Sequence, residues 1–284
     1  MRKIIFAPFI WYLLLGFVYV SLCAPATIVD AAIVSGSVVA FEPDAAENIA
    51  IAGARIFLLD EEDNIIAHGV CSEAGGFNLE VPDDAKVQPF LQGPVESETF
   101  INTYHSFLTV ADWQPEELVD LVLMIIPKMV ADEVVDQVNS HPHLAPIDVS
   151  KGIITGSVKA LMDKESKTFQ TVAGVTVTCT NTLTGEAIEA VTVYMNDTGQ
   201  FDPTLRTTSS QGHYIIYNIP IDERGFANLS LRADKDTFVF MYVPHARAYP
   251  YCASPKKVTI VPLEGFRIVP EYVTATDSDD GGGG

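Results

Sequence analysis

The chain has 284 residues, of which 48% are hydrophobic and 10% aromatic. This composition can build ordered cores and argues against a wholly disordered protein. The formal net charge is −20 at pH 7, which makes nucleic acid and anionic membrane surfaces poor partners, because binding either one needs a basic surface.

Residues 1–26 have the features of a secretory signal peptide. Arg2 and Lys3 precede an uncharged run over residues 4–20, and the small residues of Ser21–Ala26 suit cleavage after Cys23 or Ala26. A cleaved signal predicts a secreted, periplasmic or cell-surface protein. An uncleaved membrane anchor is the alternative, because the apolar run approaches the roughly 20 residues needed to span a bilayer. A lipidated Cys23 is disfavoured by the bulky Leu22 before it.

The first half of the mature chain reads as a series of short strands. Residues 77–81 alternate between apolar and polar side chains, the period of a half-buried strand, and the polar turn Asp60–Asn64 links two other runs into a hairpin. Tyr104 and Phe107 are expected to be core aromatics. The predicted strands cover residues 33–41, 55–59, 65–70, 77–81, 87–91 and 100–110.

Residues 115–126 are ambiguous between a helix and a strand. Pro115 and two acids suit the first turn of a helix, whereas residues 119–126 form a dense, β-branched apolar run. We favour the strand, because it completes a seven-strand sandwich. The next segment, Lys128 to Asn139, is predicted to be an amphipathic helix, with Val130, Val134 and Val138 on one face.

The second half again reads as strands, over residues 153–161, 175–180, 187–194, 214–219, 227–233, 238–243 and 258–261. Residues 196–204 are predicted to form an exposed loop. The acidic, glycine-ended tail over residues 271–284 has the composition of a flexible linker.

The two halves repeat the same glycine-led pattern. In the first half it contains Gly36, Gly53 and Gly76 and closes on Val81-Pro82; in the second it contains Gly156, Gly174 and Gly212 and closes on Ile219-Pro220. The first spacing is 17 residues in one copy and 18 in the other, and the next is 23 against 38, so the second copy carries a predicted 15-residue insertion.

These residues resemble the carboxypeptidase regulatory-like domain, which implies a prealbumin-like (transthyretin-like) fold, a small antiparallel β-sandwich of about seven strands. The first copy departs from the family, with Cys71-Ser72-Glu73 where a Thr-Asp pair is common, and the second departs through its insertion. In peptidases the domain is an accessory module, so the resemblance implies no peptidase activity.

The histidines do not begin the patterns expected of an enzyme. None of the six starts a His-x-x-Glu or His-Glu-x-x-His motif, and the chain has no Gly-x-Ser-x-Gly elbow and no phosphate loop. The sequence therefore predicts a non-catalytic protein without a cofactor.

Acidic loops suggest one metal hypothesis. Asp197 and Asp202, with Asn196 and the Asp60–Asn64 turn, supply the oxygen ligands that Ca²⁺ prefers. The alternative is that these residues only form turns, and we favour it.

Aromatic residues and cysteines suggest two further candidates. Trp113, Tyr249 and Tyr251 would serve as sugar platforms if exposed, but we favour core packing or loop anchoring for each of them. Cys179 and Cys252 lie in one repeat and would pair in an oxidising compartment, with buried free thiols as the alternative.

The sequence thus predicts an all-β protein with two tandem seven-strand-type sandwiches. The predicted organisation is a signal peptide (1–26), a first sandwich (30–127), a helix and linker (128–150), a second sandwich (151–270) and a tail (271–284). We expect a structural, adhesive or protein-interaction module, whose partner is an envelope protein or a glycan. Carbohydrate binding and calcium-dependent binding are the alternatives.

Overall fold

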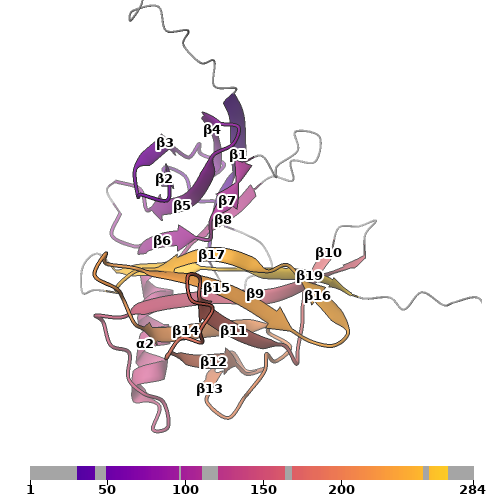
Figure 1. Cartoon of the computed structure of the whole chain (residues 1–284). Helices are drawn as coiled ribbons and strands as arrows, with labels where there is room; N and C mark the ends of the chain where they lie inside the picture. Colours follow the sequence, from indigo (N-terminus) through magenta and orange to yellow (C-terminus); the bar gives the residue numbers. More distant parts are fainter. Residues whose placement is uncertain are drawn as a thin grey trace, which may run out of the picture.

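The computed structural model describes residues 31–41, 49–95, 97–110, 121–163, 168–251 and 256–267. The chain is mostly β-structure, with two β-sandwiches stacked one above the other and a helix along one side (Figure 1). The predicted signal peptide and tail lie outside the described residues. Within them, no helix is long and apolar enough to cross a membrane.

The first repeat is a sandwich of two sheets. One has the order β4-β1-β8, and the other runs β3-β2-β5-β6, with β7 paired to β5. Between them lies a core that includes Val38, Ile56 and Leu91, none of which has solvent exposure. The strands are β1 (Ala31–Ala40), β2 (Arg55–Leu59), β3 (Ile65–Val70), β4 (Gly76–Pro82), β5 (Lys86–Gln92), β6 (Asn102–His105), β7 (Leu108–Thr109) and β8 (Leu121–Ile125).

The C-terminal part of the ambiguous segment, residues 115–126, is a strand. β8 pairs in parallel with β1, with Gly36 opposite Leu121, so strand is confirmed for residues 121–125, while residues 111–120 are not described. The predicted strand over 100–110 is wrong in one respect. It breaks into β6 and β7 at Ser106-Phe107, because the N–H of Phe107 donates to the His245 carbonyl of the second repeat, 3.2 Å away.

The predicted helix is confirmed as α2 (Lys128–Ser140), which starts directly after Pro127. Ala131 and Val138 are buried, and Val130, Val134 and Val135 pack beside them. This apolar face covers the outer face of a sheet in the second repeat, so that repeat has three layers: sheet, sheet and helix (Figure 1).

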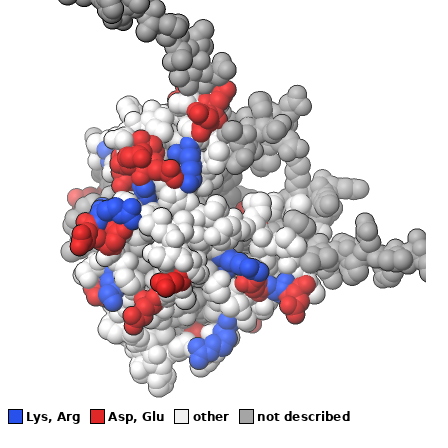
Figure 2. Space-filling model, in the orientation of Figure 1, with Lys and Arg blue, Asp and Glu red and all other residues white. Residues whose placement is uncertain are grey.

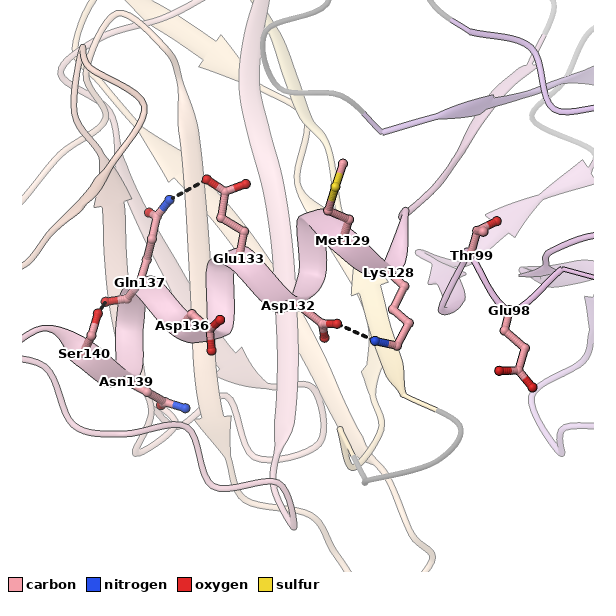
Figure 3. A pocket seen from close by; sticks show the side chains of 10 residues that line it. All are labelled: Glu98, Thr99, Lys128, Met129, Asp132, Glu133, Asp136, Gln137, Asn139 and Ser140. Carbon is pink, nitrogen blue, oxygen red and sulfur yellow. Dashed lines mark hydrogen bonds and ion pairs between the residues drawn. The ribbon is translucent and has the colours of Figure 1, made fainter.

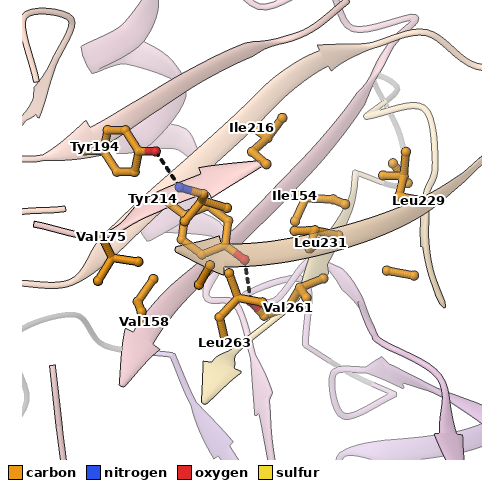
Figure 4. Packing of buried hydrophobic residues seen from close by; sticks show 14 of the residues in the cluster. Ile154, Val158, Val175, Tyr194, Tyr214, Ile216, Leu229, Leu231, Val261 and Leu263 are labelled. Carbon is orange, nitrogen blue, oxygen red and sulfur yellow. Dashed lines mark hydrogen bonds between the residues drawn. The ribbon is translucent and has the colours of Figure 1, made fainter. Parts of the chain in front are cut away.

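The second repeat has the same frame. Sheet β11-β15-β17 faces the sheet that contains β13-β12-β14-β9-β18. The core between them is built around Tyr214, whose hydroxyl donates to the Val261 carbonyl at 2.6 Å (Figure 4). The strands are β9 (Gly152–Asp163), β10 (Thr168–Thr171), β11 (Thr176–Asn181), β12 (Val191–Met195), β13 (Phe201–Asp202), β14 (His213–Ile219), β15 (Ala227–Asp234), β16 (Phe238–Phe240), β17 (Val243–Ala248), β18 (Lys257–Ile260) and β19 (Leu263–Arg267).

The first glycine of each copy has the same structural role. A Cβ on Gly36 would lie 2.1 Å from the Leu121 carbonyl oxygen, and a Cβ on Gly156 would lie 2.1 Å from the Val261 carbonyl oxygen. Each glycine therefore lets β1 or β9 approach a neighbouring backbone. The second glycines also agree, since Gly53 and Gly174 have φ of 71° and 73°.

The third glycine corrects the sequence alignment by one residue. Gly212 has φ of 69°, and its carbonyl accepts a hydrogen bond from Val158 N at 2.9 Å. The matching residue is Gly75, with φ of 75° and a carbonyl that accepts from Val38 N at 2.9 Å. Gly76, predicted to be the equivalent, is instead the first residue of β4.

The additional residues of the second copy form more than a loop. Residues 196–200 form the turn between β12 and β13, and β12 pairs antiparallel with β14. The predicted strand over 187–194 is therefore partly wrong: Ala187 makes only a bridge to Thr180, and the paired strand starts at Val191. The predicted strand over 238–243 likewise divides into β16 and β17, which pair with different strands.

The two repeats share a sheet. β18 pairs in parallel with β6 of the first repeat, with Lys257 opposite Asn102 and Ile260 opposite His105. A 13-stranded sheet thus runs from β13 of the second repeat to β3 of the first. Backbone hydrogen bonds, in addition to the connecting helix, join the two halves of the molecule.

Candidate functional site

The most elaborate polar cluster in the described residues lies where the two repeats meet, and we call it the joint. Its centre is Arg247 of β17, with a side chain only 3% exposed. The guanidinium Nη1 donates to Asp63 Oδ1 of the first repeat at 2.8 Å, and Nη2 donates to the Glu61 carbonyl. A buried guanidinium needs such partners, because an unpaired buried charge is costly.

Aromatic rings enclose the same guanidinium. Its Cζ lies 4.9 Å from the ring centre of Phe107 in the first repeat and 4.3 Å from that of Phe226 in the second. Both distances are within the range of cation–π attraction. Arg247 is therefore held by charge, hydrogen bonds and rings drawn from both repeats.

A column of stacked rings also crosses the joint. Phe57, Phe90 and Tyr104 of the first repeat stack with centroid separations of 5.5 and 4.4 Å. Tyr249 of the second repeat continues the column, 4.1 Å from Tyr104, and Phe226 follows at 6.1 Å. Such offset pairs contribute about 0.5–1.5 kcal/mol each beyond the area they bury.

The Tyr249 hydroxyl fixes the column in register. It lies 2.9 Å from Gln88 Oε1 and 3.1 Å from Asp63 Oδ1, both of the first repeat, and donates its proton to these acceptors. Burial and the Asp63 charge raise the pKa of Tyr249 above its usual range, so the hydroxyl keeps its proton. Gln88 is fully buried and donates through Nε2 to the His105 carbonyl at 2.9 Å.

A histidine forms the outer side of the joint. The His245 ring stacks on Phe107 at 4.1 Å, and its Nδ1 is 3.3 Å from Glu61 Oε1. Burial, together with the charges of Lys86 and Arg247, lowers the pKa of His245 to about 4, against the opposing effect of Glu61. At neutral pH the ring is therefore neutral, and its single N–H can serve either Glu61 or Asn228 Oδ1, which lies 3.0 Å from Nε2.

The acidic turn of the sequence analysis belongs to this joint. Asp60 Oδ1 accepts from the N–H groups of Glu62 and Asn64 at 2.9 and 2.8 Å, which shapes the turn. Asp63, in the left-handed region at φ 64°, then presents its carboxylate to Arg247. The carboxylate that we considered as a calcium ligand thus neutralises a buried arginine.

The other two predicted calcium ligands also hold turns. Asp197 Oδ1 accepts from Ser210 N and Oγ at 3.0 and 2.7 Å, and Asp202 Oδ1 accepts from Thr204 N and Oγ1 at 2.8 and 2.6 Å. These hydrogen bonds lower the pKa of both carboxyls. Across the described part of the chain, no three His, Cys, Asp or Glu residues gather as a metal site would require.

Two of the three candidate sugar platforms are buried. Tyr249 is 7% exposed in the joint, and Tyr251 is 2% exposed in the layer beneath α2. Core packing, the favoured role, is confirmed for both rings, and neither can act as a sugar platform. Trp113 lies outside the described residues.

Of the predicted bridge between Cys179 and Cys252, the structure describes one residue. Cys179 is a free thiol that packs against the core of the second repeat, where burial raises its pKa to about 12. Cys252 itself is among the residues that the structure does not describe.

A hollow of about 1080 Å³ lies along the outside of α2. Four of its ten lining residues are acidic, and its Lys128 pairs with Asp132 at 2.5 Å (Figure 3). On the face drawn in Figure 2, acidic and basic side chains occur in small mixed groups between wide uncharged areas.

Arg247, the centre of the joint, was not predicted from the sequence. Arg247 stands in the otherwise uncharged run Pro244-His245-Ala246-Arg247-Ala248-Tyr249, and a charge in such a run is a signal for a buried ion pair. Its partner Asp63 lies 184 residues earlier, and no local pattern connects the two.

Comparison with known proteins gives only distant likenesses. No family model and no curated protein matches the chain. Among solved structures, the TIE protein of Bacillus anthracis is 8% identical at a TM-score of 0.26, over 83% of this chain and 34% of that one. A minor pilin of Streptococcus agalactiae is 11% identical at 0.28, over 84% and 96%. A protein described as a putative adhesin from Bacteroides ovatus is 7% identical at 0.23, over 81% and 92%. This chain thus spans about a third of the first of these proteins.

Proposed function

We propose that this chain is a non-catalytic protein of the cell envelope or the extracellular space, in which two carboxypeptidase regulatory-like sandwiches act as one rigid structural or adhesive module. The observation that carries the proposal is the joint. Arg247, Tyr249 and the β18–β6 pairing connect the repeats through buried hydrogen bonds, stacked rings and a shared sheet.

A rigid connection between two repeats requires many specific contacts. Their presence here supports a mechanical role or a role in presenting binding surfaces. Interfaces between domains of one chain are by default polar and allow relative motion. Here a buried arginine, a buried glutamine and a five-ring column are used instead. A module that holds binding surfaces at fixed positions benefits from such a joint, whereas an isolated binding domain does not need one.

The chemistry of the described residues supports the same proposal. The titratable groups of the joint are engaged with each other, Arg247 with Asp63 and His245 with Glu61. The two thiols in the described residues, Cys71 and Cys179, have pKa values raised by burial to about 11 and about 12. Neither is a ready nucleophile, because the thiolate is the reactive form.

The rigidity is tested by small-angle X-ray scattering on Arg247→Ala. We expect the wild-type profile to fit one compact shape, and the variant profile to require a mixture of inter-repeat angles and a larger maximum dimension. Arg232→Ala is the control, because Arg232 is 69% exposed and pairs only with Asp234 nearby. A wild-type protein with freely moving repeats would refute the rigid-module proposal.

Two further assays address the activity and the role. Incubation with peptide and polysaccharide substrates should give no turnover, with or without added divalent metal, and metal-dependent hydrolysis would contradict the proposal. Envelope fractions should retain the wild-type protein more strongly than Arg247→Ala if the fixed arrangement of both repeats is what the partner binds.

A further inference from the structure

A small sheet projects from one end of the second repeat. The first half of β9 pairs with β14 and β18, and its second half pairs with β10 on one side and β19 on the other. β16 completes the order β10-β9-β19-β16. We call this sheet the end sheet; it lies at the right of the lower sandwich in Figure 1.

Exposed apolar side chains concentrate on the end sheet. Of the fourteen large hydrophobic side chains that are exposed in the described residues, five belong to its strands or directly follow them. They are Met162 (42% exposed), Phe169 (43%), Val239 (44%), Met241 (62%) and Tyr242 (56%). Single exposed apolar residues are common on protein surfaces, whereas contiguous groups mark interaction sites.

Three apolar residues form a row on one face. Phe169 of β10 is opposite Leu161 of β9, and both Leu161 and Val239 of β16 are opposite Phe266 of β19. Directly opposed residues lie on the same face of a sheet, so Phe169, Leu161 and Val239 line up across the strands.

This row continues a face that the chain covers elsewhere. Ile153 of β9 packs under α2, and Ile154 points into the sandwich core. Since side chains alternate along a strand, Leu161 lies on the same face as Ile153. The helix thus covers the beginning of this face, whereas Phe169 and Val239 on its continuation in the end sheet are 43% and 44% exposed.

The charge of the end sheet differs from that of the whole molecule. The described segments that build it, residues 159–162, 168–171, 232–242 and 263–264, contain three basic and three acidic residues, whereas the whole chain has 17 basic and 37 acidic. Two copies of so acidic a protein repel each other over most of their surfaces, and this repulsion is least where charge is balanced.

We infer that the end sheet is the surface through which two copies of this chain associate. A two-fold axis brings the row Phe169–Leu161–Val239 of one copy against the same row of the other, places the near-neutral ends together and keeps the acidic surfaces apart. β10 and β16 contain no charged residue, so neither edge strand carries a charge that would oppose the association of a second copy. The inference names a partner for the module proposed above, but the joint can be rigid without it.

The test is sedimentation velocity of the purified chain between about 1 and 300 μM, comparing wild type with the double variant Phe169→Lys/Val239→Lys. We expect concentration-dependent dimers for wild type and at least a tenfold weaker association for the variant, because like charges would then face each other. Leu183→Lys is the matched control: Leu183 is 75% exposed in the turn after β11, away from the end sheet.

Three results would overturn the inference. They are a wild-type protein that stays monomeric throughout the range, a double variant that associates as wild type does, and a control that weakens association equally. Far-ultraviolet circular dichroism and thermal melting establish that the variants fold. A glycan array in which monomeric wild type binds sugar and the double variant does not would assign the surface to carbohydrate instead. The scattering test on Arg247→Ala is independent, so the rigid-module proposal and this inference can fail separately.

Discussion

The two repeats use one sandwich frame in two different environments, and the difference is in the outer face of one sheet. In the second repeat, Ile215 and Tyr217 of β14 are buried beneath α2. With Gly75 matched to Gly212, the equivalent residues of β4 are Asn78 and Glu80, which are exposed. The inner faces of both strands are apolar. The frame therefore depends on the inner face, and the outer face decides whether a further layer can dock.

The two repeats also differ in whether the strand in question, β4 or β14, lies at the edge of its sheet. Among the described strands, β4 pairs with β1 alone, whereas β14 pairs with β9 and with β12. Glu80 and Pro82 on β4 are residues that discourage pairing of an exposed edge. The added residues of the second repeat supply β12 and make such protection unnecessary there.

The largest expected effect comes from adding a side chain at the first glycine of each repeat, where both repeats bring two backbones close together. Gly36→Ala and Gly156→Ala should each destabilise the protein by at least about 3 kcal/mol, because the new Cβ would overlap a carbonyl oxygen. Guanidinium chloride unfolding measures the change. Gly76→Ala is the control, with its nearest neighbour 3.4 Å away, and a loss there as large as at Gly36 would contradict the corrected alignment.

An exchange of residues between the repeats should be strongly asymmetric. Ile215→Asn should cost about 3 kcal/mol, since it removes a side chain that is 1% exposed and buries an amide. Asn78→Ile, the reverse change at the matching exposed position, should alter stability by less than about 0.5 kcal/mol. Equal losses in urea unfolding would show that the outer faces do not differ as described.

Acid should weaken the protein through a histidine in each repeat. Burial lowers the pKa of His105 on β6 to about 4, and that of His245 on β17 is also about 4. The unfolded chain therefore binds more protons between pH 6.5 and 4, so stability falls as pH falls through this window. For the fully buried His105 the loss approaches about 3 kcal/mol.

His105→Gln should flatten the pH dependence more than His245→Asn, because His245 keeps part of its ring exposed. Chemical denaturation at pH 7, 5.5 and 4.5 provides the comparison. An unchanged slope in His105→Gln would assign the acid sensitivity to other groups.

The smallest effect concerns the turn before the third glycine. Thr208 Oγ1 donates to the Val172 carbonyl at 2.6 Å and accepts from Val175 N at 3.0 Å. Cys71 holds the matching place, as its N–H donates to Ala54 just as that of Thr208 donates to Val175. Thr208→Val should cost about 1.5 kcal/mol and Cys71→Val less than half of that, as thermal melting would report. Equal shifts would mean that the two turns do not differ in their side-chain bonding.

Local patterns predicted most of the fold. Alternation within residues 77–81 and the apolar runs at 55–59 and 65–70 identified strands whose observed limits agree within a residue. The stripe of Val130, Val134 and Val138 identified α2. These succeeded because periodicity is a property of neighbouring residues.

The misses have a different physical origin. Gly75 and Gly76 are adjacent, and only the positive φ of Gly75 distinguishes them. Tyr249 and Tyr251 were candidates for both core and surface roles, because nothing near them in sequence reveals the first repeat or α2 above them. The pairing of Asp63 with Arg247 depends on the tertiary fold alone.

The parallel pairing of β18 with β6 also has a consequence for synthesis. Lys257 pairs with Asn102, which leaves the ribosome 155 residues earlier. Throughout that interval the newly made first repeat exposes the edge of β6 and the ring of Tyr104. Long-range parallel pairing of this kind is slow to form, and an unpaired strand is prone to the wrong partners until it forms. Pairing of β18 therefore acts as the closing step for the first sandwich, so a nascent chain lacking residues 256–267 should depend more on chaperones than the full chain.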